Sequence, residues 1–193
     1  MSNDKVGSIL KLVKEYIDEK RENQNWTKGE DWVNYSGPHF SSEEYTSAIE
    51  ILLSEWLIFG KKARHFENEF PQHLGQKFGV LTNSGSSANL LMANVFKSKS
   101  KAMEKFHMPP GSKFITPVVC FPTTINPLIQ AGYEPVFVDV DLPSMNLNLD
   151  EVEAELEKDP NIRAITFAHV LGNPPDMDRV MALVEKYNLN FLE

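Results

Sequence analysis

Apolar residues recur with a helical period in the first part of the chain. Residues 4–23 carry one apolar stripe with charged residues opposite, which predicts an amphipathic helix. The stripe consists of Val6, Ile9, Leu10, Val13 and Ile17. A second helix is predicted to begin at the capping-box pattern from Ser41 to Glu44 and to end at Gly60. A third helix follows, and Pro71 predicts a kink or a break within it.

After residue 78 the pattern changes to short apolar runs that alternate with helical periods. Strands are predicted at 79–82, 113–116, 135–139, 162–168 and 189–192. Helices are predicted near 86–97, 122–131, 149–158 and 176–187. The alternation is typical of an α/β fold with a mainly parallel sheet, in which ligands bind at the carboxyl ends of the strands. The Lys-rich segment 98–112 is predicted to be a surface insertion or a linker.

Composition narrows the class of protein. The chain has 193 residues and a net charge of −8, which argues against a nucleic-acid binder. Cys120 is the single cysteine, so a disulfide framework is excluded, and with no base beside it in the sequence a buried thiol is expected. An N-terminal signal segment and an apolar run of about 18 residues are both absent from the sequence. We therefore expect a cytoplasmic enzyme or binding protein with no membrane partner.

The segment from Asn83 to Asn89 combines small residues with the predicted start of a helix. Such a start leaves backbone N–H groups unpaired and carries the positive end of the helix dipole. Gly85 lets the backbone approach a phosphate closely, and the neighbouring serine hydroxyls can donate to it. The pattern contains neither the Lys of a Walker A loop nor the dinucleotide glycine fingerprint. It fits a phosphate site, and it equally fits an ordinary Ser-capped helix.

Further candidate residues lie where predicted strands end. Phe121 could stack on a flat ring or belong to the core, and His169 could orient a ligand or serve as a structural hydrogen-bonding group. Asp139 and Asp141 form a carboxylate pair without a third ligand at metal spacing, so turn roles are preferred and no metal site is expected. Asp176 or Asp178 is predicted to be the N-cap or a first-turn acid of the last helix.

Four segments occur in an order that resembles one family. They are Asn83–Leu90, Phe121–Pro127, Pro135–Val140 and His169–Pro174. Their order resembles the DegT/DnrJ (StrS-type) sugar aminotransferase family of enzymes that depend on pyridoxal phosphate (PLP). The doubled serine Ser86-Ser87, Phe-Pro-Thr-Thr and His-x-Leu-Gly-Asn-Pro resemble the nucleotide-sugar 3-dehydrase branch. This branch includes the CDP-4-keto-6-deoxyglucose-3-dehydrase and GDP-4-keto-6-deoxymannose-3-dehydratase types, and the choice of nucleotide stays open. Tyr35-Ser36-Gly37-Pro38 also resembles this branch, and the likeness runs from about residue 30 to the end.

The resemblance implies an aminotransferase fold of type I, of which this chain is a large-domain fragment. Residues 1–60 would form an N-terminal helical segment, and residues 61–193 part of the PLP-binding α/β domain. The resemblance also implies which residues bind the cofactor, as PLP or as pyridoxamine phosphate (PMP). Gly85 and Ser86 hold its phosphate with Ser87 beside them, Phe121 stacks on its ring, and the loop with His169 and Asn173 lines the pocket.

In the family, the strand that ends here at Glu193 continues with an Asp that pairs with the cofactor's ring nitrogen. A Schiff-base Lys follows in aminotransferases, and a His takes its place in the dehydrase branch. Some relatives also hold a [2Fe–2S] cluster. The resemblance thus implies that the catalytic residues follow residue 193, and that this chain alone is inactive.

Three functions remain open from the sequence. The first is a PLP/PMP-dependent 3-dehydrase that removes the C3 hydroxyl of a nucleotide-linked 4-keto-6-deoxy sugar, for deoxysugars of surface polysaccharides such as lipopolysaccharide O-antigen. Such an enzyme is expected to be a homodimer that works with a reductase. The second is a 4-keto sugar aminotransferase of the same family. The third is a catalytically inactive binding or assembly subunit.

Overall fold

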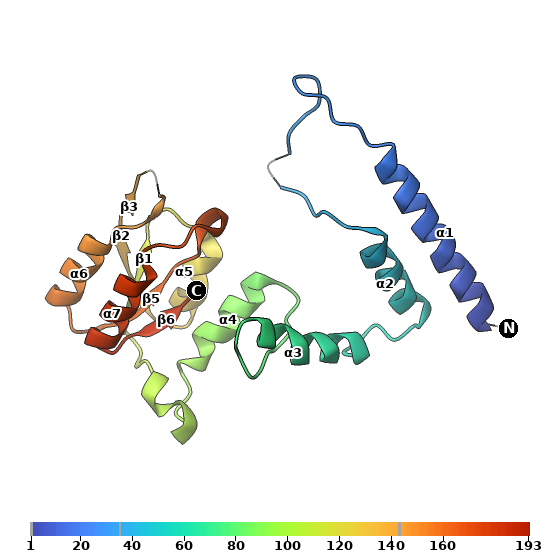
Figure 1. Ribbon diagram of the computed structural model, residues 1–193. Coiled ribbons are helices and arrows are strands. Elements are labelled where there is room, and N and C mark those ends of the chain that lie inside the picture. Colours follow the sequence, from blue (N-terminus) through green and yellow to red (C-terminus); the bar gives the residue numbers. More distant parts are fainter. Residues whose placement is uncertain (1, 35, 143) are drawn as a thin grey trace. The chain divides into compact units, whose positions relative to one another are not determined.

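The computed structural model describes residues 2–34, 36–142 and 144–193. Tyr35, which contributed to the resemblance, lies outside these described residues. The contacts divide the chain into two compact units, Met1–Val80 and Leu81–Glu193. Figure 1 labels the helices and strands of both units. The predicted boundary at residue 60, between the N-terminal helical segment and the PLP-binding domain, stays a prediction.

The first unit is helical. Its helices are α1 (Ser2–Glu22), α2 (Ser42–Leu53) and α3 (Lys61–His73), and α1 packs against α2. The predicted capping box is confirmed, because the backbone N–H of Ser41 donates to the Glu44 carboxylate at 2.6 Å while the Ser41 hydroxyl caps the first turn. Among the described residues, no helix of the chain combines the length and the apolar character that crossing a membrane requires.

Two predictions for the first unit are corrected by the structure. The second helix ends at Leu53 and not at Gly60. The Ser54 hydroxyl donates to a carbonyl of the last turn, and Glu55 takes a left-handed conformation with φ of 57°, which a right-handed helix cannot continue. Pro71 does not break α3 where it stands, because it lies in the last turn and the helix ends soon after it.

The second unit is built on a parallel sheet, as the alternating pattern predicts. Its strand order is β2-β1-β5-β6, and every neighbouring pair is parallel. Ile115 is the register partner of Val136 on one side and of Ile165 on the other. The strands are β1 (Lys113–Pro117), β2 (Glu134–Val138), β5 (Ile162–Thr166) and β6 (Asn190–Leu192), and an antiparallel pair is formed by β3 (Val140–Asp141) and β4 (Asn146–Leu147).

Helices cover both faces of this sheet (Figure 1). Successive strand residues point to opposite faces, so Ile115 joins the core under α6 and α7 while Phe114 joins the core under α4 and α5. Both side chains are fully buried. The α-helices are α4 (Gly85–Val95), α5 (Pro122–Gln130), α6 (Leu149–Lys158) and α7 (Met177–Tyr187). Two short 3₁₀ helices are η1 (Lys101–Phe106) and η2 (Val170–Gly172).

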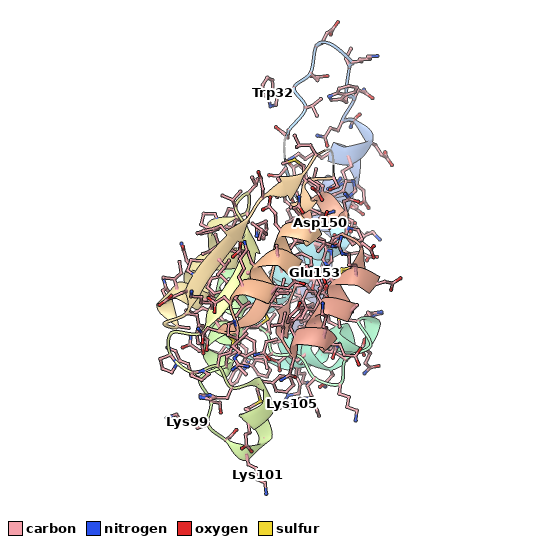
Figure 2. All side chains as sticks on the ribbon, turned by 90° about the vertical axis from the view of Figure 1, so that its left-hand side faces the viewer. Trp32, Lys99, Lys101, Lys105, Asp150 and Glu153 are labelled. Atoms are coloured by element: carbon pink, nitrogen blue, oxygen red, sulfur yellow. The ribbon has the colours of Figure 1, made fainter. Side chains whose placement is uncertain are left out.

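Two further predictions are wrong. Residues 79–82 form no strand, because they belong to neither of the two sheets that the described residues form. Apolar character alone does not create a strand, since a strand also needs a sheet to join. Segment 98–112 is not wholly a surface insertion. Its lysines do project outward, as Figure 2 shows for Lys99, Lys101 and Lys105. Met108, however, is only 1% exposed and belongs to the core under α4 and α5.

Candidate functional site

The start of α4 presents an accessible helix N-terminus. Ser84 is the N-cap, and its hydroxyl oxygen accepts the backbone N–H of Ser87 at 3.2 Å. Gly85 and Ser86, the first helical residues, are exposed. The first intrahelical backbone bond of α4 runs from the N–H of Ala88 to the carbonyl of Ser84. The N–H groups of Gly85 and Ser86 therefore have no acceptor within the helix and remain available to an anion, together with the positive end of the dipole.

The three serines of this segment differ in what their hydroxyls do. The hydroxyls of Ser84 and Ser87 lie 3.2 Å apart and hydrogen-bond to each other. Among the described residues, no protein group hydrogen-bonds the hydroxyl of Ser86. Ser86 therefore offers a free hydroxyl beside the unpaired N–H groups, whereas Ser84 and Ser87 stabilise the helix start.

The start of α5 lies beside α4. The side-chain amide of Asn89 in α4 donates to the carbonyl of Thr123 in the first turn of α5 at 3.0 Å. Phe121 is the N-cap of α5, and its ring is 69% exposed. The start of α5 lies at the carboxyl edge of the sheet because α5 follows the carboxyl end of β1. The bond between Asn89 and Thr123 brings the first turns of α4 to the same edge. The structure thus places an exposed helix start and an exposed aromatic residue at one edge.

A cavity of about 180 Å³ opens at the same edge. Its walls come from α4, α5 and the carboxyl ends of β5 and β6, and include Asn89, Met92, Thr124, Phe167 and Glu193. His169 lies beside it, with its Nε2 atom 2.7 Å from Oε2 of Glu193. Neither Asn89 nor Glu193 was among the predicted site residues, although an Asn inside the apolar period of α4 was a usable signal.

Asn173 is directed elsewhere. Its side-chain amide donates to the carbonyl of Ser144, in the connection between β3 and β4, at 3.1 Å. The turn between His169 and Asn173 contains Leu171 in a left-handed conformation with φ of 54°, and that side chain is 94% exposed. Gly85, Ser86, Ser87, Phe121 and His169 therefore share the carboxyl edge, whereas the Asn173 side chain does not point into it. The cofactor roles of all six residues stay predictions.

The remaining candidates have structural roles. Asp176 caps α7 by accepting the N–H of Arg179, which confirms that prediction. Asp139 accepts the N–H of Val140, and among the described residues no group of three metal-ligating side chains gathers. Cys120 is half-buried, and burial raises the pKa of its thiol. This thiol is not primed as a nucleophile.

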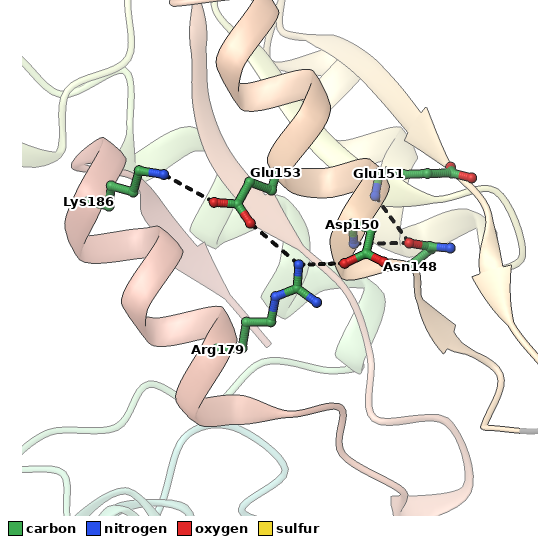
Figure 3. Close-up of polar contacts among 6 residues, drawn as sticks. All are labelled: Asn148, Asp150, Glu151, Glu153, Arg179 and Lys186. Carbon is green, nitrogen blue, oxygen red and sulfur yellow. Dashed lines mark hydrogen bonds and ion pairs between the residues drawn. The ribbon is translucent and has the colours of Figure 1, made fainter.

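A network of charges joins α6 to α7 (Figure 3). Arg179 contacts Asp150 at 2.6 Å and Glu153 at 3.4 Å, and Lys186 contacts Glu153 at 3.0 Å. Lys186 and then Arg179 hold the pKa of the Glu153 carboxyl below its usual range. A cavity of about 220 Å³ lies beside this network, but each of these charges already has an opposite partner. The arrangement clamps two helices together and offers no reactive group.

Comparison with known proteins gives this edge a context. Residues 38–193 match the DegT/DnrJ/EryC1/StrS aminotransferase family. The chain is 35% identical over 193 residues to the dTDP-4-dehydro-2,6-dideoxy-D-glucose 3-dehydratase of Saccharopolyspora spinosa, covering 100% of this chain and 41% of that protein. It is 34% identical over 192 residues to the lipopolysaccharide biosynthesis protein RfbH of Salmonella typhimurium, covering 100% of this chain and 43% of that protein.

Solved structures agree with the sequence relatives. The GDP-4-keto-6-deoxy-D-mannose-3-dehydratase of E. coli, solved with bound hydrated PLP, superposes with a TM-score of 0.74 at 28% identity. The superposition covers 84% of this chain and 41% of that one, and it confirms the predicted fold of type I. The chain thus spans about two fifths of the length of the relatives it matches. With most of its length matched and its fold shared, the chain belongs to the DegT/DnrJ/EryC1/StrS aminotransferase family.

Proposed function

We propose that this chain forms the part of a sugar-modifying enzyme that binds the phosphate and the ring of PLP or PMP. The proposal rests on one observation above the others. The exposed start of α4, with its free Ser86 hydroxyl, lies at the same sheet edge as the exposed ring of Phe121. A phosphate and a flat ring need these two kinds of surface.

The residues at this edge fit the cofactor chemically. The N–H groups of Gly85 and Ser86, with the Ser86 hydroxyl, would hold the phosphate, and Ser87 would keep the helix start in place. Phe121 would cover one face of the ring. When bound, the cofactor supplies an electron-withdrawing ring that stabilises negative charge on the substrate carbon.

The reaction we propose is that of a 3-dehydratase, which removes the C3 hydroxyl of a nucleotide-linked 4-keto-6-deoxy sugar. Relatives whose names state a 3-dehydratase activity support this assignment. A homodimer and a reductase partner form part of the same proposal. A 4-keto sugar aminotransferase is the second candidate, because the matched family is named for that reaction. A Lys after residue 193 at the Schiff-base position would favour the aminotransferase, and a His there the dehydratase.

The test of cofactor binding is the substitution Ser86→Ala in the product of the complete reading frame. Loss of a charge-assisted hydrogen bond should weaken PLP binding by about 1–3 kcal/mol, or roughly 5- to 150-fold in Kd. Absorbance titration with PLP measures this. Ser100→Ala is the matched control, because Ser100 is an exposed serine of the same unit that precedes η1. Equal affinity of wild type and Ser86→Ala would contradict the assignment of the phosphate site.

A further inference from the structure

His169 joins the carboxyl ends of two neighbouring strands. The ladder between β5 and β6 has Thr166 and Leu192 as its last partners, and the N–H of Phe167 donates to the carbonyl of Leu192 at 3.3 Å. Beyond this point the ring of His169 contacts the Glu193 carboxylate, with 2.7 Å between Nε2 and Oε2. This hydrogen bond therefore ties the strands together where the paired backbone has ended.

The ring of His169 is held in one orientation. It packs edge-on against Phe167, with 5.5 Å between the ring centroids and 75° between the planes, and Phe167 is itself 3% exposed. The other ring nitrogen, Nδ1, is buried and has no hydrogen-bond partner among the described residues. Because a carboxylate only accepts, Nε2 carries the proton that is donated to Glu193. Glu193 is thus the one polar partner that the structure records for this ring.

The segment after His169 is anchored as well. Its far end is fixed by the bond from Asn173 to the carbonyl of Ser144, and the N–H of Gly172 donates to the carbonyl of His169 at 3.0 Å. The turn between these two anchors bears the exposed Leu171. The turn is therefore closed by a bond of its own and fixed at its Asn173 end, which limits how far the backbone of His169 can move.

Glu193 and Phe167 both line the cavity at the carboxyl edge. We propose that His169 is a positioning residue, which fixes the Glu193 wall of this cavity and does not itself contact the cofactor. The inference rests on the proposed function and refines it, because it replaces a direct cofactor contact of His169 with an indirect one. Loss of the bond would let the end of β6 shift, and with it the cavity wall and the direction of any chain that follows.

The test uses the product of the complete reading frame and compares two substitutions. His169→Phe keeps a ring against Phe167 but removes the donor, whereas His169→Gln keeps an N–H donor of similar reach. We expect His169→Phe to weaken PLP binding about tenfold, the loss typical of one hydrogen bond to a charged group, and to change the absorption spectrum of the bound cofactor. His169→Gln should stay within about threefold of wild type with the wild-type spectrum.

A second pair of substitutions tests the route through Glu193. Glu193→Ala should match His169→Phe, Glu193→Gln should bind like wild type, and the double variant His169→Phe/Glu193→Ala should bind no more weakly than either single variant. The two Glu193 variants test the proposal even if His169→Phe does not fold. Lys113→Met is the matched control. It breaks an ion pair of the same 2.7 Å length at the start of β1, so it should lower the melting temperature and leave the cofactor spectrum unchanged.

The outcomes separate this inference from the proposed function. If the wild-type protein binds PLP and His169→Phe binds it with the same affinity and the same spectrum, the positioning role is wrong and the proposed function stands. Losses that add in the double variant would show that His169 acts by a route other than Glu193. A wild-type protein that binds no PLP would overturn the proposed function and this inference together.

Discussion

Met108 offers the sharpest test of how the α4–α5 side of the sheet is held. Its side chain is 1% exposed and shares a core with Phe96, Phe114 and Leu128. Met108→Ala would remove this side chain while the backbone bond from its N–H to the carbonyl of Phe96, at 2.9 Å, can persist. The loss therefore comes from packing alone.

The magnitude follows from that burial. Full burial of a Met side chain contributes about 1.5–3 kcal/mol, and the cavity left behind raises the cost of Met→Ala in a core to about 2–5 kcal/mol. Complete burial in a cluster of large side chains places Met108→Ala near the middle of that range. We expect a loss of about 3 kcal/mol in the free energy of unfolding.

Urea unfolding followed by far-UV circular dichroism measures this loss, and hydrogen exchange of peptides that cover β1 localises it. Met181→Ala is the matched control, because Met181 is 46% exposed on α7, and its effect should stay within about 0.5 kcal/mol. A loss below about 1 kcal/mol for Met108→Ala would refute the reasoning. It would mean that Met108 is not packed in the core and that residues 98–112 are a surface segment, as the sequence predicted.

Two other substitutions give distinct signatures. Phe121→Ala should leave the melting temperature almost unchanged, because the ring is 69% exposed, yet weaken PLP binding and alter its absorbance; a wild-type spectrum would remove Phe121 from the site. A hydrogen bond from Lys113 holds the pKa of Asp159 below its usual range, so the stabilisation is present above about pH 4 and is lost as the pH falls through the lowered pKa. Melting temperatures from pH 6 to 3 should therefore fall less steeply for Asp159→Asn than for wild type, and parallel curves would contradict this.

Local signals in the sequence predicted what depends on local physics. The capping box at Ser41 and the cap at Asp176 were predictable, because a cap needs only a side chain and the N–H groups that follow it within one turn. The parallel sheet was predictable for a similar reason. The spacing of apolar residues distinguishes strands from helices, and a chain in which strands and helices alternate can form few folds other than a parallel sheet.

Predictions failed where a distant partner decides the outcome. Residues 79–82 have the apolar character of a strand, but they belong to neither of the sheets that the described residues form. Met108 lies in a polar, Lys-rich segment, and only the core under α4 and α5 determines that it is buried. In both cases the deciding contact lies outside the window in which periodicity can be read.

In the candidate site, too, some features follow from local sequence and others depend on distant contacts. The sequence alone determined the helix start at Gly85-Ser86-Ser87, because small and hydroxyl residues before an apolar period are typical of a capped helix N-terminus. Through resemblance, it also determined the cofactor class. Only the tertiary structure decided that the Ser86 hydroxyl is free, that His169 bonds Glu193 and that Asn173 bonds Ser144. These partners are separated by 24 residues for His169 and 29 for Asn173. Folding brings them together because parallel strands gather their carboxyl ends at one edge, which no local pattern encodes.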